Sequence, residues 1–329
     1  MKKWIKFGGG IVISALFLFL IFRGVDIKTV VDIIAQARLV YLFLSLFVSG
    51  LMLVVRSYRW KMLIKEYYGF SFSNFFESTN IGLGANNVLP FRMGDFVQAY
   101  LLSRKTGLSK SLTFSTVLME RFVDFFPPIL IIIIGSFFIV LPKQISLPLS
   151  CSVLAGLIVG MNFLIKFKEK ILGFVEAICD KNHKFDKFYK VIQNFYFGID
   201  SFKDSSLVLK IFFMTLLLWS GYSISVYFCC LSLGIKLPSV WSSFLIQGIT
   251  VLSVVIPSSP GYIGTWEAMG ILALKVLGFN QTIGLAFGIL SHLVAIVPVS
   301  MFGMYYLIKE FSIIKNVEKE VEDENKSQA

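Results

Sequence analysis

Long runs of uncharged apolar residues constrain this chain more than any other feature of its sequence. A helix that crosses the hydrocarbon core of a bilayer needs about 20 largely apolar residues. Runs of nearly this length or longer occur at Phe7–Phe22, Leu39–Val55, Phe125–Leu141, Leu149–Ile165, Ile211–Ile235 and Val276–Ile308. Hydrophobic residues make up 56% of the chain and charged residues 16%, whereas soluble domains have about 25% charged residues. The sequence therefore predicts an all-α membrane protein with about six full transmembrane helices.

The positions of lysine and arginine predict how the chain is oriented. If the amino terminus is cytoplasmic, 23 of these 31 residues fall in cytoplasmic segments, six fall on the outer side, and Arg92 and Arg121 fall at membrane depth. This is the bias expected of a multi-pass protein of the cytoplasmic membrane, here with both termini in the cytoplasm. The first apolar run has no small-residue cleavage site after it, so we expect an uncleaved helix rather than a signal peptide.

The net charge of +11 indicates the kind of partner. Because the basic residues lie beside membrane spans, they favour anionic lipid rather than nucleic acid. The four cysteines show no ligand spacing, so we expect neither a metal site nor a disulfide framework. We expect no cofactor, and homo-oligomerisation stays open.

Two stretches do not fit simple crossings, because proline and glycine split them into short apolar arms. The first is residues 74–105, with arms Ser78–Leu89 and Phe96–Ser103, and the second is residues 237–277, with arms Leu237–Ile256 and Thr265–Leu274. An arm of about ten helical residues covers half of the hydrocarbon thickness. We interpret both stretches as re-entrant hairpins, although Leu237–Ile256 is long enough to span.

The two hairpins align with each other. Pro90 and Gly94 correspond to Pro260 and Gly264 at one constant offset, and a single-residue gap then brings Gly107 onto Gly278. Each half has three crossings, an odd number, so we predict an inverted repeat of residues 1–145 and 146–329. Inverted repeats with broken helices are typical of secondary transporters. The alternative is that glycine and proline recur by chance.

Two polar regions of the second half lie outside the predicted spans. Residues 166–205 carry an apolar stripe at helical spacing flanked by lysines, which fits either an interfacial helix or a helix packed on the bundle. The tail, residues 318–329, is polar and is predicted to be disordered.

The first group of candidate site residues is Arg92, Gly94 and Asp95 at the tip of the first hairpin. Gly94 opens the second arm, and a helix amino terminus beside an arginine suits an anion such as a lipid phosphate. The alternative is that Asp95 caps the arm and pairs with Arg92.

The second group is Glu120, Arg121 and Asp124, which share one face of a predicted helix Ser111–Leu141. One arginine between two carboxylates leaves surplus negative charge, whose partner could be Arg92, a coupling proton or a cationic substrate group. A structural ion cluster is the alternative. The repeat pairs Arg121 with His292, which is either a titrating residue or a neutral core histidine.

The third group is Pro260, Gly261, Gly264 and Glu267 at the tip of the second hairpin. Glu267 lies in the first turn of an arm, where it either caps the helix or acts in the site. The sequence carries no nucleotide-binding or hydrolase motif, so we assign no catalytic residue.

Three segments together resemble the lysylphosphatidylglycerol synthase transmembrane family. They are LPFRMGDFVQAYLL (89–102), MERFVDFF (119–126) and IPSSPGYIGTWEAM (256–269). This family includes the flippase half of the bifunctional multiple-peptide-resistance proteins and stand-alone relatives. The resemblance covers nearly the whole chain and implies a role in moving polar lipids, either aminoacylated phosphatidylglycerol or isoprenoid-linked lipids. By motif position it carries over Arg92, Asp95, Glu120, Arg121, Asp124 and Glu267 as substrate-binding residues.

The chain departs from the family pattern in two ways. Gln98 and His292 stand where the family often has arginine, and the residues after 310 are too few for an aminoacyl-transferase domain. We therefore expect a lipid flippase rather than an enzyme. The alternative is a membrane subunit of a phosphatidylglycerol lysyltransferase or another lipid-modifying system.

Overall fold

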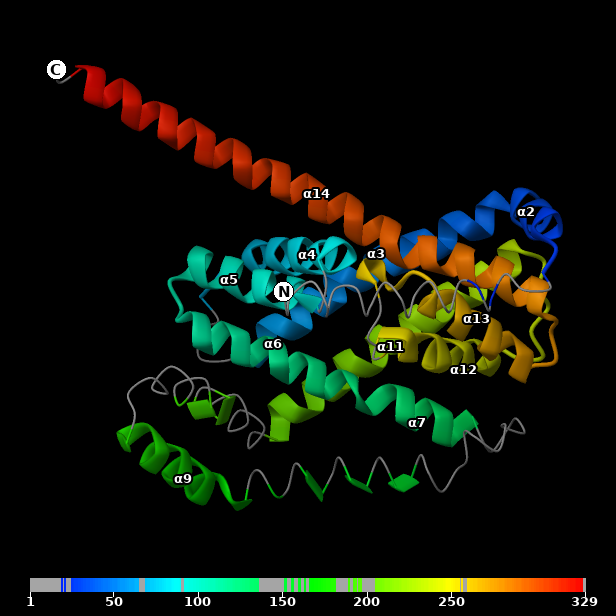
Figure 1. Ribbon diagram of the computed structural model, residues 1–329, viewed down its shortest axis with the longest axis horizontal. Helices are drawn as coiled ribbons and strands as arrows, with labels where there is room; N and C mark the ends of the chain where they lie inside the picture. The colour runs from blue at the N-terminus through cyan, green and yellow to red at the C-terminus, as the bar shows by residue number, and fades with distance from the viewer. Residues whose placement is uncertain are drawn as a thin grey trace.

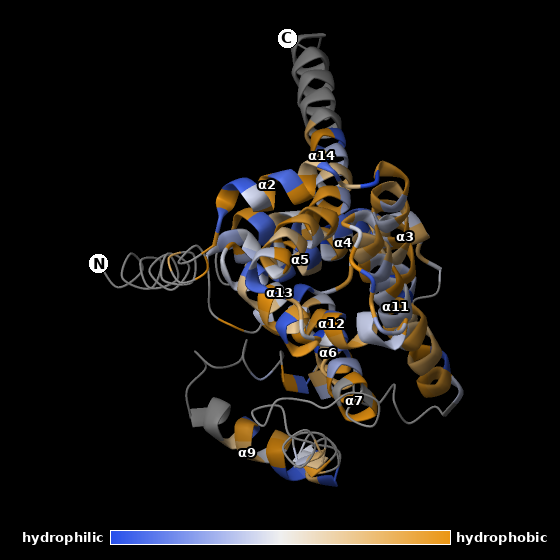
Figure 2. Cartoon of the chain, turned by 90° about the vertical axis from the view of Figure 1, so that its right-hand side faces the viewer, coloured by the Kyte–Doolittle hydropathy of each residue, from blue (hydrophilic) through white to orange (hydrophobic). Residues whose placement is uncertain are grey.

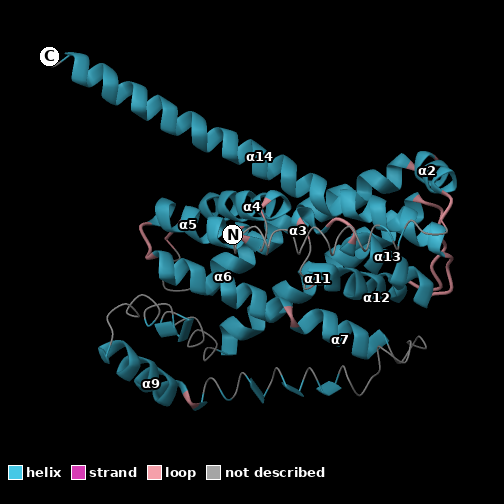
Figure 3. Ribbon diagram, in the orientation of Figure 1, coloured by secondary structure: helices cyan, strands magenta, loops and turns pink. Residues whose placement is uncertain are grey.

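The fold is helical throughout the described part of the chain (Figures 1 and 3). A computed structural model describes residues 19, 21, 25–64, 69–89, 92–135, 166–181, 205–254, 256 and 259–327, with scattered positions between 151 and 196. The helices are α2 (Ile27–Ala35), α3 (Leu39–Leu63), α4 (Phe72–Val88), α5 (Gly94–Thr106), α6 (Lys110–Asp124), α7 (Phe126–Gly135), α9 (Lys168–Lys181), α11 (Ser205–Ser232), α12 (Trp241–Thr250), η5 (Val251–Val254), η6 (Pro260–Tyr262), α13 (Thr265–Val276) and α14 (Gln281–Ser327).

Three described helices are long and apolar enough to cross a membrane, at Leu39–Leu63, Ser206–Ser232 and Gln281–Phe311. Figure 2 shows the hydrophobic colouring along α3, α11 and α7. Phe43, Phe47 and Leu51 lie on one face of α3 and are exposed despite being apolar, as expected of a face that meets lipid. The predicted spans Phe7–Phe22 and Leu149–Ile165 lie largely outside the described residues.

The two predicted hairpins are both present as pairs of packed helices. Helix α4 packs on α5, and α12 packs on α13. The helices of the first pair have 17 and 13 residues, longer than the arms predicted from hydropathy, because α4 begins at the polar cap Ser71, whose side chain accepts a hydrogen bond from the Ser73 N–H. The tip residues Pro90, Pro257 and Ser258 lie outside the described residues, and re-entry into a membrane stays a prediction.

Close glycine contacts fix the helix pairs. A Cβ atom added at Gly94 would lie 2.0 Å from the Gly82 carbonyl oxygen, so only glycine lets α5 approach α4 this closely. A Cβ added at Gly261 would lie 3.2 Å from the Asn87 carbonyl oxygen. Because Asn87 lies near the end of α4 and Gly261 lies in η6, the tips of the two hairpins are in contact.

The backbone also repeats at the offset that the sequence suggested. Arg92 and Tyr262, which correspond in the alignment of the hairpins, are the two non-glycine residues with positive φ in the described part of the chain, at 55° and 60°. The corresponding glycines Gly107 and Gly278 have φ of 73° and 86°. These positions agree with a repeat, whereas the inverted arrangement of the halves stays a prediction.

The predicted helix Ser111–Leu141 is interrupted in the structure. Helix α6 ends at Asp124, and α7 begins at Phe126. Pro127 and Pro128 follow the break, and a proline in a helix removes a backbone hydrogen bond and clashes with the carbonyl four residues earlier. The prediction of one continuous helix was therefore wrong, because these prolines end α6 immediately after its acidic and basic residues.

Helix α14 packs on α4 and then extends beyond the rest of the bundle (Figure 1). Lys105 of α5 pairs with Glu77 of α4 and with Glu310 of α14, which ties the first hairpin to this helix. Helix α14 continues to Ser327, where a disordered tail was predicted. The tail is rich in glutamate and lysine, which are good helix formers, so it extends a helix that is already nucleated.

The basic segment of residues 166–205 is described only in part. Helix α9 covers Lys168–Lys181, and Ile192 and Phe195 of the predicted apolar stripe pack against the core cluster that contains Trp60 and Leu102. This contact favours packing on the bundle over an interfacial position for this part of the stripe. The other stripe residues lie outside the described residues.

Candidate functional site

A cavity of about 460 Å³ lies where the two hairpin tips meet the long helices. Its wall includes Arg56 of α3, Arg92 at the first tip, Arg121 and Asp124 of α6, Tyr222 of α11, Tyr262 at the second tip, and Trp266 and His292. Residues from both halves of the sequence therefore line a single cavity, and Arg92, Arg121, Asp124 and His292 among them are candidates from the sequence.

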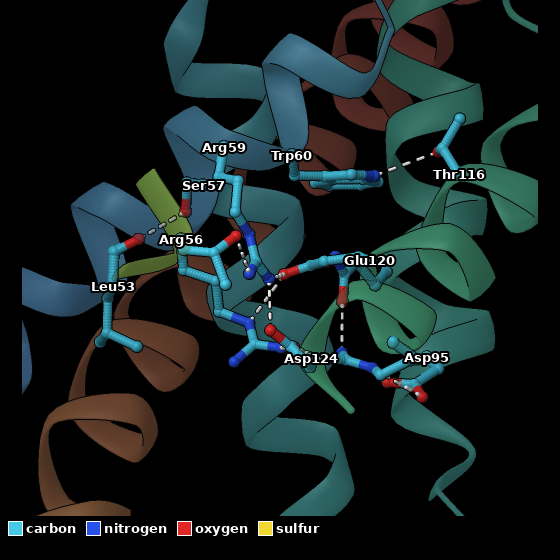
Figure 4. Close-up of polar contacts among 12 residues, drawn as sticks. Leu53, Arg56, Ser57, Arg59, Trp60, Asp95, Thr116, Glu120 and Asp124 are labelled. Atoms are coloured by element: carbon cyan, nitrogen blue, oxygen red, sulfur yellow. Dashed lines mark hydrogen bonds and ion pairs between the residues drawn. The ribbon is translucent and has the colours of Figure 1, made fainter. Parts of the chain in front are cut away.

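The acidic residues of α6 are bound by two arginines of α3 (Figure 4). Arg56 Nε lies 2.9 Å from Glu120 Oε1, and Arg56 Nη2 lies 2.8 Å from Asp124 Oδ2. Arg59 Nη2 lies 2.7 Å from Asp124 Oδ1 and 3.3 Å from Glu120 Oε1. The side chains of Arg59 and Glu120 are fully buried. Each carboxylate thus contacts both arginines, which gives the ion pairs compensating hydrogen bonds inside the bundle.

Sequence reasoning missed Arg56 and Arg59. It ended the span at Val55 and placed both arginines in a cytoplasmic segment, but α3 continues to Leu63. The extension is stable because Trp60 is fully buried and donates from Nε1 to Thr116 Oγ1 at 3.1 Å, packing this end of α3 on α6. The sequence signal that could have found these arginines was the surplus negative charge of Glu120 and Asp124, because two buried carboxylates require cations from elsewhere in the chain.

A second set of contacts joins the first hairpin to α6. The Arg121 guanidinium donates from Nη2 to Asp95 Oδ1 at 2.9 Å and from Nε to Oδ2 at 3.2 Å, a two-point contact. Asn86 Nδ2 donates to the same carboxylate at 3.1 Å, and Asn86 Oδ1 accepts from the Gly94 N–H at 2.8 Å. The first free N–H of α5 is therefore bonded to Asn86, and Asp95 serves mainly as the partner of Arg121.

Arg92 differs from the other three arginines. Its closest carboxylate contact is 3.8 Å, from Nε to Asp95 Oδ2, and its side chain is 37% exposed. Its left-handed backbone, with φ of 55°, holds it at the tip rather than along a helix. The cluster of Arg56, Arg59, Arg92, Arg121, Asp95, Glu120 and Asp124 has four cations and three carboxylates. The net charge of the cluster is therefore positive, whereas the residues of α6 alone predicted a negative one. Arg92 is the cation with the weakest pairing.

The second hairpin contributes a separate polar group. Glu267 Oε2 accepts from the Gly264 N–H at 2.7 Å, so it caps α13, and its Oε1 lies 2.6 Å from His292 Nδ1. His292 Nε2 lies 2.7 Å from the Gly261 carbonyl oxygen. The indole ring of Trp266 stacks on the imidazole with ring centroids 5.3 Å apart. Glu267 therefore caps its helix and also lies in the polar group, and His292 links the second tip to α14.

The described residues contain no group of three or more histidine, cysteine or acidic side chains placed to hold a metal ion. What the cavity can do chemically follows from its composition. Arginines in a low-dielectric site bind carboxylates and phosphates strongly, since water does not screen them there.

These features define a multi-pass helical membrane protein with a charged internal cavity. The chain belongs to the family described as the lysylphosphatidylglycerol synthase TM region, whose model matches residues 9–303. This assignment confirms the resemblance carried by the three sequence segments.

The chain is similar to curated membrane proteins of two organisms. The UPF0104 membrane protein MJ1595 of Methanocaldococcus jannaschii is 27% identical over 310 residues, covering 89% of this chain and 91% of the relative. The UPF0104 membrane protein MJ1078 of the same organism is 30% identical over 244 residues, covering 73% of this chain and 98% of the relative. A UPF0104 membrane protein of Methanothermobacter thermautotrophicus is 22% identical over 297 residues, covering 83% and 86%. No solved structure matches the chain significantly.

Proposed function

We propose that this protein is a transporter of the flippase kind for a polar, anionic lipid. The observation that carries the proposal is the positive surplus of the cavity cluster inside a membrane bundle, with Arg92 the cation least occupied by carboxylates. Charged groups within a membrane are costly and usually mark a substrate path. A lipid phosphate or an equivalent anionic headgroup matches this charge.

A second cavity supports an amphipathic ligand. It has a volume of about 620 Å³, and its walls are almost entirely apolar, formed by α6, α7, α11 and α12. Trp219 lines this cavity and also the charged one, so the two are neighbours. A lipid has the same division into a charged headgroup and apolar chains. In the proposed complex the headgroup meets Arg92 and Arg121 while an acyl chain lies along Phe126 and Phe244.

The contact between the hairpin tips supports a transport mechanism. Because Gly261 lies against Asn87, movement of one hairpin against the other changes access to the cavity between them. In the proposed cycle the two halves are inverted repeats in the cytoplasmic membrane, both termini are cytoplasmic, and rocking of the halves opens the cavity to each leaflet in turn.

Translocation of a fluorescent phosphatidylglycerol in reconstituted liposomes tests the proposal. Removing a hydrogen bond to a charged group costs about 1.5–3 kcal/mol, so we expect Arg92→Gln to slow translocation about tenfold or more. Arg104→Gln is the matched control, because Arg104 lies on α5 and is exposed outside the cavity. If Arg92→Gln and Arg104→Gln transport at the same rate, the headgroup does not use Arg92 and this site assignment is wrong.

The name of the matched family favours one second candidate. It describes the membrane region of a synthase, so the chain would then be the membrane partner of a lipid-modifying enzyme such as a lysyltransferase. Co-purification of a cytoplasmic transferase, together with no translocation by the reconstituted protein, would select this candidate over the transporter.

A further inference from the structure

Glu267 and His292 form a buried polar group that joins α13 to α14. The two residues are buried, with exposed fractions of 8% and 6%. Nδ1 of the imidazole faces Glu267 Oε1 at 2.6 Å, and Nε2 faces the Gly261 carbonyl oxygen at 2.7 Å. The other carboxyl oxygen, Oε2, accepts from the Gly264 N–H.

These contacts determine how many protons the pair holds. A carbonyl oxygen only accepts, so Nε2 must carry a hydrogen that it donates to Gly261. The contact between Nδ1 and Oε1 needs one further hydrogen. That hydrogen belongs either to an imidazolium beside a carboxylate or to a protonated Glu267 beside a neutral imidazole. Both arrangements hold one proton more than a neutral histidine beside a carboxylate.

Loss of this proton would break a contact in either tautomer. With the remaining hydrogen on Nε2, two lone pairs face each other between Nδ1 and Oε1 at 2.6 Å. With the hydrogen on Nδ1, the Nε2 lone pair faces the Gly261 oxygen at 2.7 Å. Buried polar atoms left without a partner destabilise the conformation that holds them. The bond between the second hairpin tip and α14 therefore depends on the proton.

We infer that Glu267 and His292 form a proton-binding site, in which one shared proton fastens the second hairpin tip to α14. Because His292 also lines the charged cavity, the site lies beside the place proposed for the lipid headgroup. The link to transport rests on the proposed function, whereas the proton site rests on hydrogen-bond geometry alone.

The surrounding charges give the direction of coupling. Helix α12 and η5, which pack on α13, carry no titratable side chain. Helix α2, which packs on α14, carries Lys28 and Asp32 and is capped by Asp26, and α4 carries Glu77 at its far end. The titratable groups that share the cavity wall with His292 are Arg56, Arg92, Arg121, Asp124, Tyr222 and Tyr262, with Cys229 of α11.

Arginines predominate on that wall, and they favour the deprotonated, negatively charged pair. An anion bound among them cancels part of their field, so it favours the protonated pair. Coupling of this kind is reciprocal, so the protonated pair binds the anion more tightly.

Nitrogen NMR of the histidines measures the proton directly. The sequence has two histidines, His183 and His292, so ¹⁵N-histidine labelling of a His183→Gln protein in detergent gives one imidazole. The nitrogen shifts distinguish imidazolium from the two neutral tautomers, and infrared spectra show a protonated carboxyl. We expect, at neutral pH, either imidazolium or an Nε2–H imidazole together with a carboxylic acid band that Glu267→Gln removes.

Glu267→Gln is the matched variant because its amide has the shape of a protonated acid. The amide oxygen can accept from the Gly264 N–H while the amide nitrogen donates to Nδ1, so all three contacts persist without a titrating proton. We expect His292 to stay a neutral Nε2–H imidazole in this variant at every pH at which the protein is folded. A neutral imidazole in the wild-type protein, without a carboxylic acid band assigned to Glu267, would overturn the proton site.

Lipid binding provides the second arm of the test. We expect the affinity of the wild-type protein for phosphatidylglycerol in nanodiscs to rise severalfold as pH falls through the transition seen by NMR. The affinity of the Glu267→Gln protein should not change across that range. Equal pH dependence in the two proteins would overturn the coupling. A shared proton seen by NMR with no lipid translocation would instead contradict the transporter proposal and leave the proton site in place.

Discussion

The first half of the chain lines the central cavity with three arginines and Asp124, whereas the second half contributes the imidazole of His292, which is bonded to Glu267. The backbones are alike at the two tips, since Arg92 and Tyr262 share a left-handed conformation at corresponding positions. Arg121 corresponds to His292 at the same offset that relates Gly107 to Gly278. The two halves therefore differ in their polar chemistry, with four clustered arginines and three carboxylates in the first half and one carboxylate bonded to one imidazole in the second.

This difference predicts unequal responses to the same mutation. Glu120→Gln removes a buried charge from between Arg56 and Arg59 and leaves both to share Asp124. Removing one partner of a buried ion pair costs about 3–5 kcal/mol. Glu267→Gln keeps the three contacts of the pair that Glu267 forms with His292, so we expect a loss below about 1 kcal/mol. The free energies of unfolding of the two variants in detergent micelles, measured side by side, test the comparison.

A compensating double variant sharpens this result. Replacing both Arg59 and Glu120 by methionine removes the charges together, and buried ion pairs replaced by apolar residues are often no less stable. We expect the double variant to recover part of the loss seen for Glu120→Gln. Equal losses for Glu120→Gln and Glu267→Gln would mean that the two halves hold their carboxylates in the same way, contrary to the comparison.

The glycine contacts test whether the helix pairs depend on close packing in both halves. A Cβ added at Gly82 would lie 2.5 Å from Gln98 Cβ, and one added at Gly288 would lie 3.0 Å from Glu267 Cα. Overpacking of this kind costs about 1–3 kcal/mol, so Gly82→Ala and Gly288→Ala should each lower thermal stability. Gly288→Ala should also disturb the His292 signal, because it pushes on the Glu267 backbone.

Gly173→Ala is the control for these two substitutions. Gly173 lies in α9, and nothing stands within 4 Å of an added Cβ. Alanine is the better helix former by about 1 kcal/mol, so this substitution should be neutral or stabilising. A stability loss at Gly173 as large as that at Gly82 would show that close packing does not explain the effect.

Hydropathy and spacing predicted the helical membrane fold, the two pairs of packed short helices and the shared face of Glu120, Arg121 and Asp124. These features are local, since each depends on residues within a few turns of one another. The true end of α3 was not predicted, because a hydropathy pattern stops at Arg56 whereas the helix is extended by the burial of Trp60. The burial of a side chain depends on residues distant in sequence, so the hydropathy pattern of one segment does not show it.

The ion pairs and the proton site show the same limit. Arg59 and Glu120 are 61 residues apart, and Arg59 also donates to Thr215 across 156 residues. Glu267 and His292 were both candidates, but on different helices 25 residues apart, so spacing could not show their contact. The sequence identified most of the charged cavity residues individually, and the fold decides which of them are partners.

The smallest expected effect on stability concerns two helix caps, one in each half, which should contribute equally. Ser109 caps α6 by accepting from the Leu112 N–H at 3.2 Å, and Asn280 caps α14 by accepting from the Ile283 N–H at 2.9 Å. The two caps correspond in the alignment of the halves, at the same offset that relates Arg121 to His292. Replacing a cap by alanine costs about 1 kcal/mol.

We expect Ser109→Ala and Asn280→Ala to lower the free energy of unfolding by similar amounts, and their effects to add in the double variant because the caps lie in separate helices. Ser109→Gly should cost only a few tenths of a kcal/mol, since glycine is tolerated at this position. Chemical denaturation of the wild-type protein and of the four variants measures all of these differences. The alternative outcome is that removing the cap lowers the free energy of unfolding in one half and not in the other. The corresponding backbone segments would then not be equally stable, and the halves would differ in more than their charges.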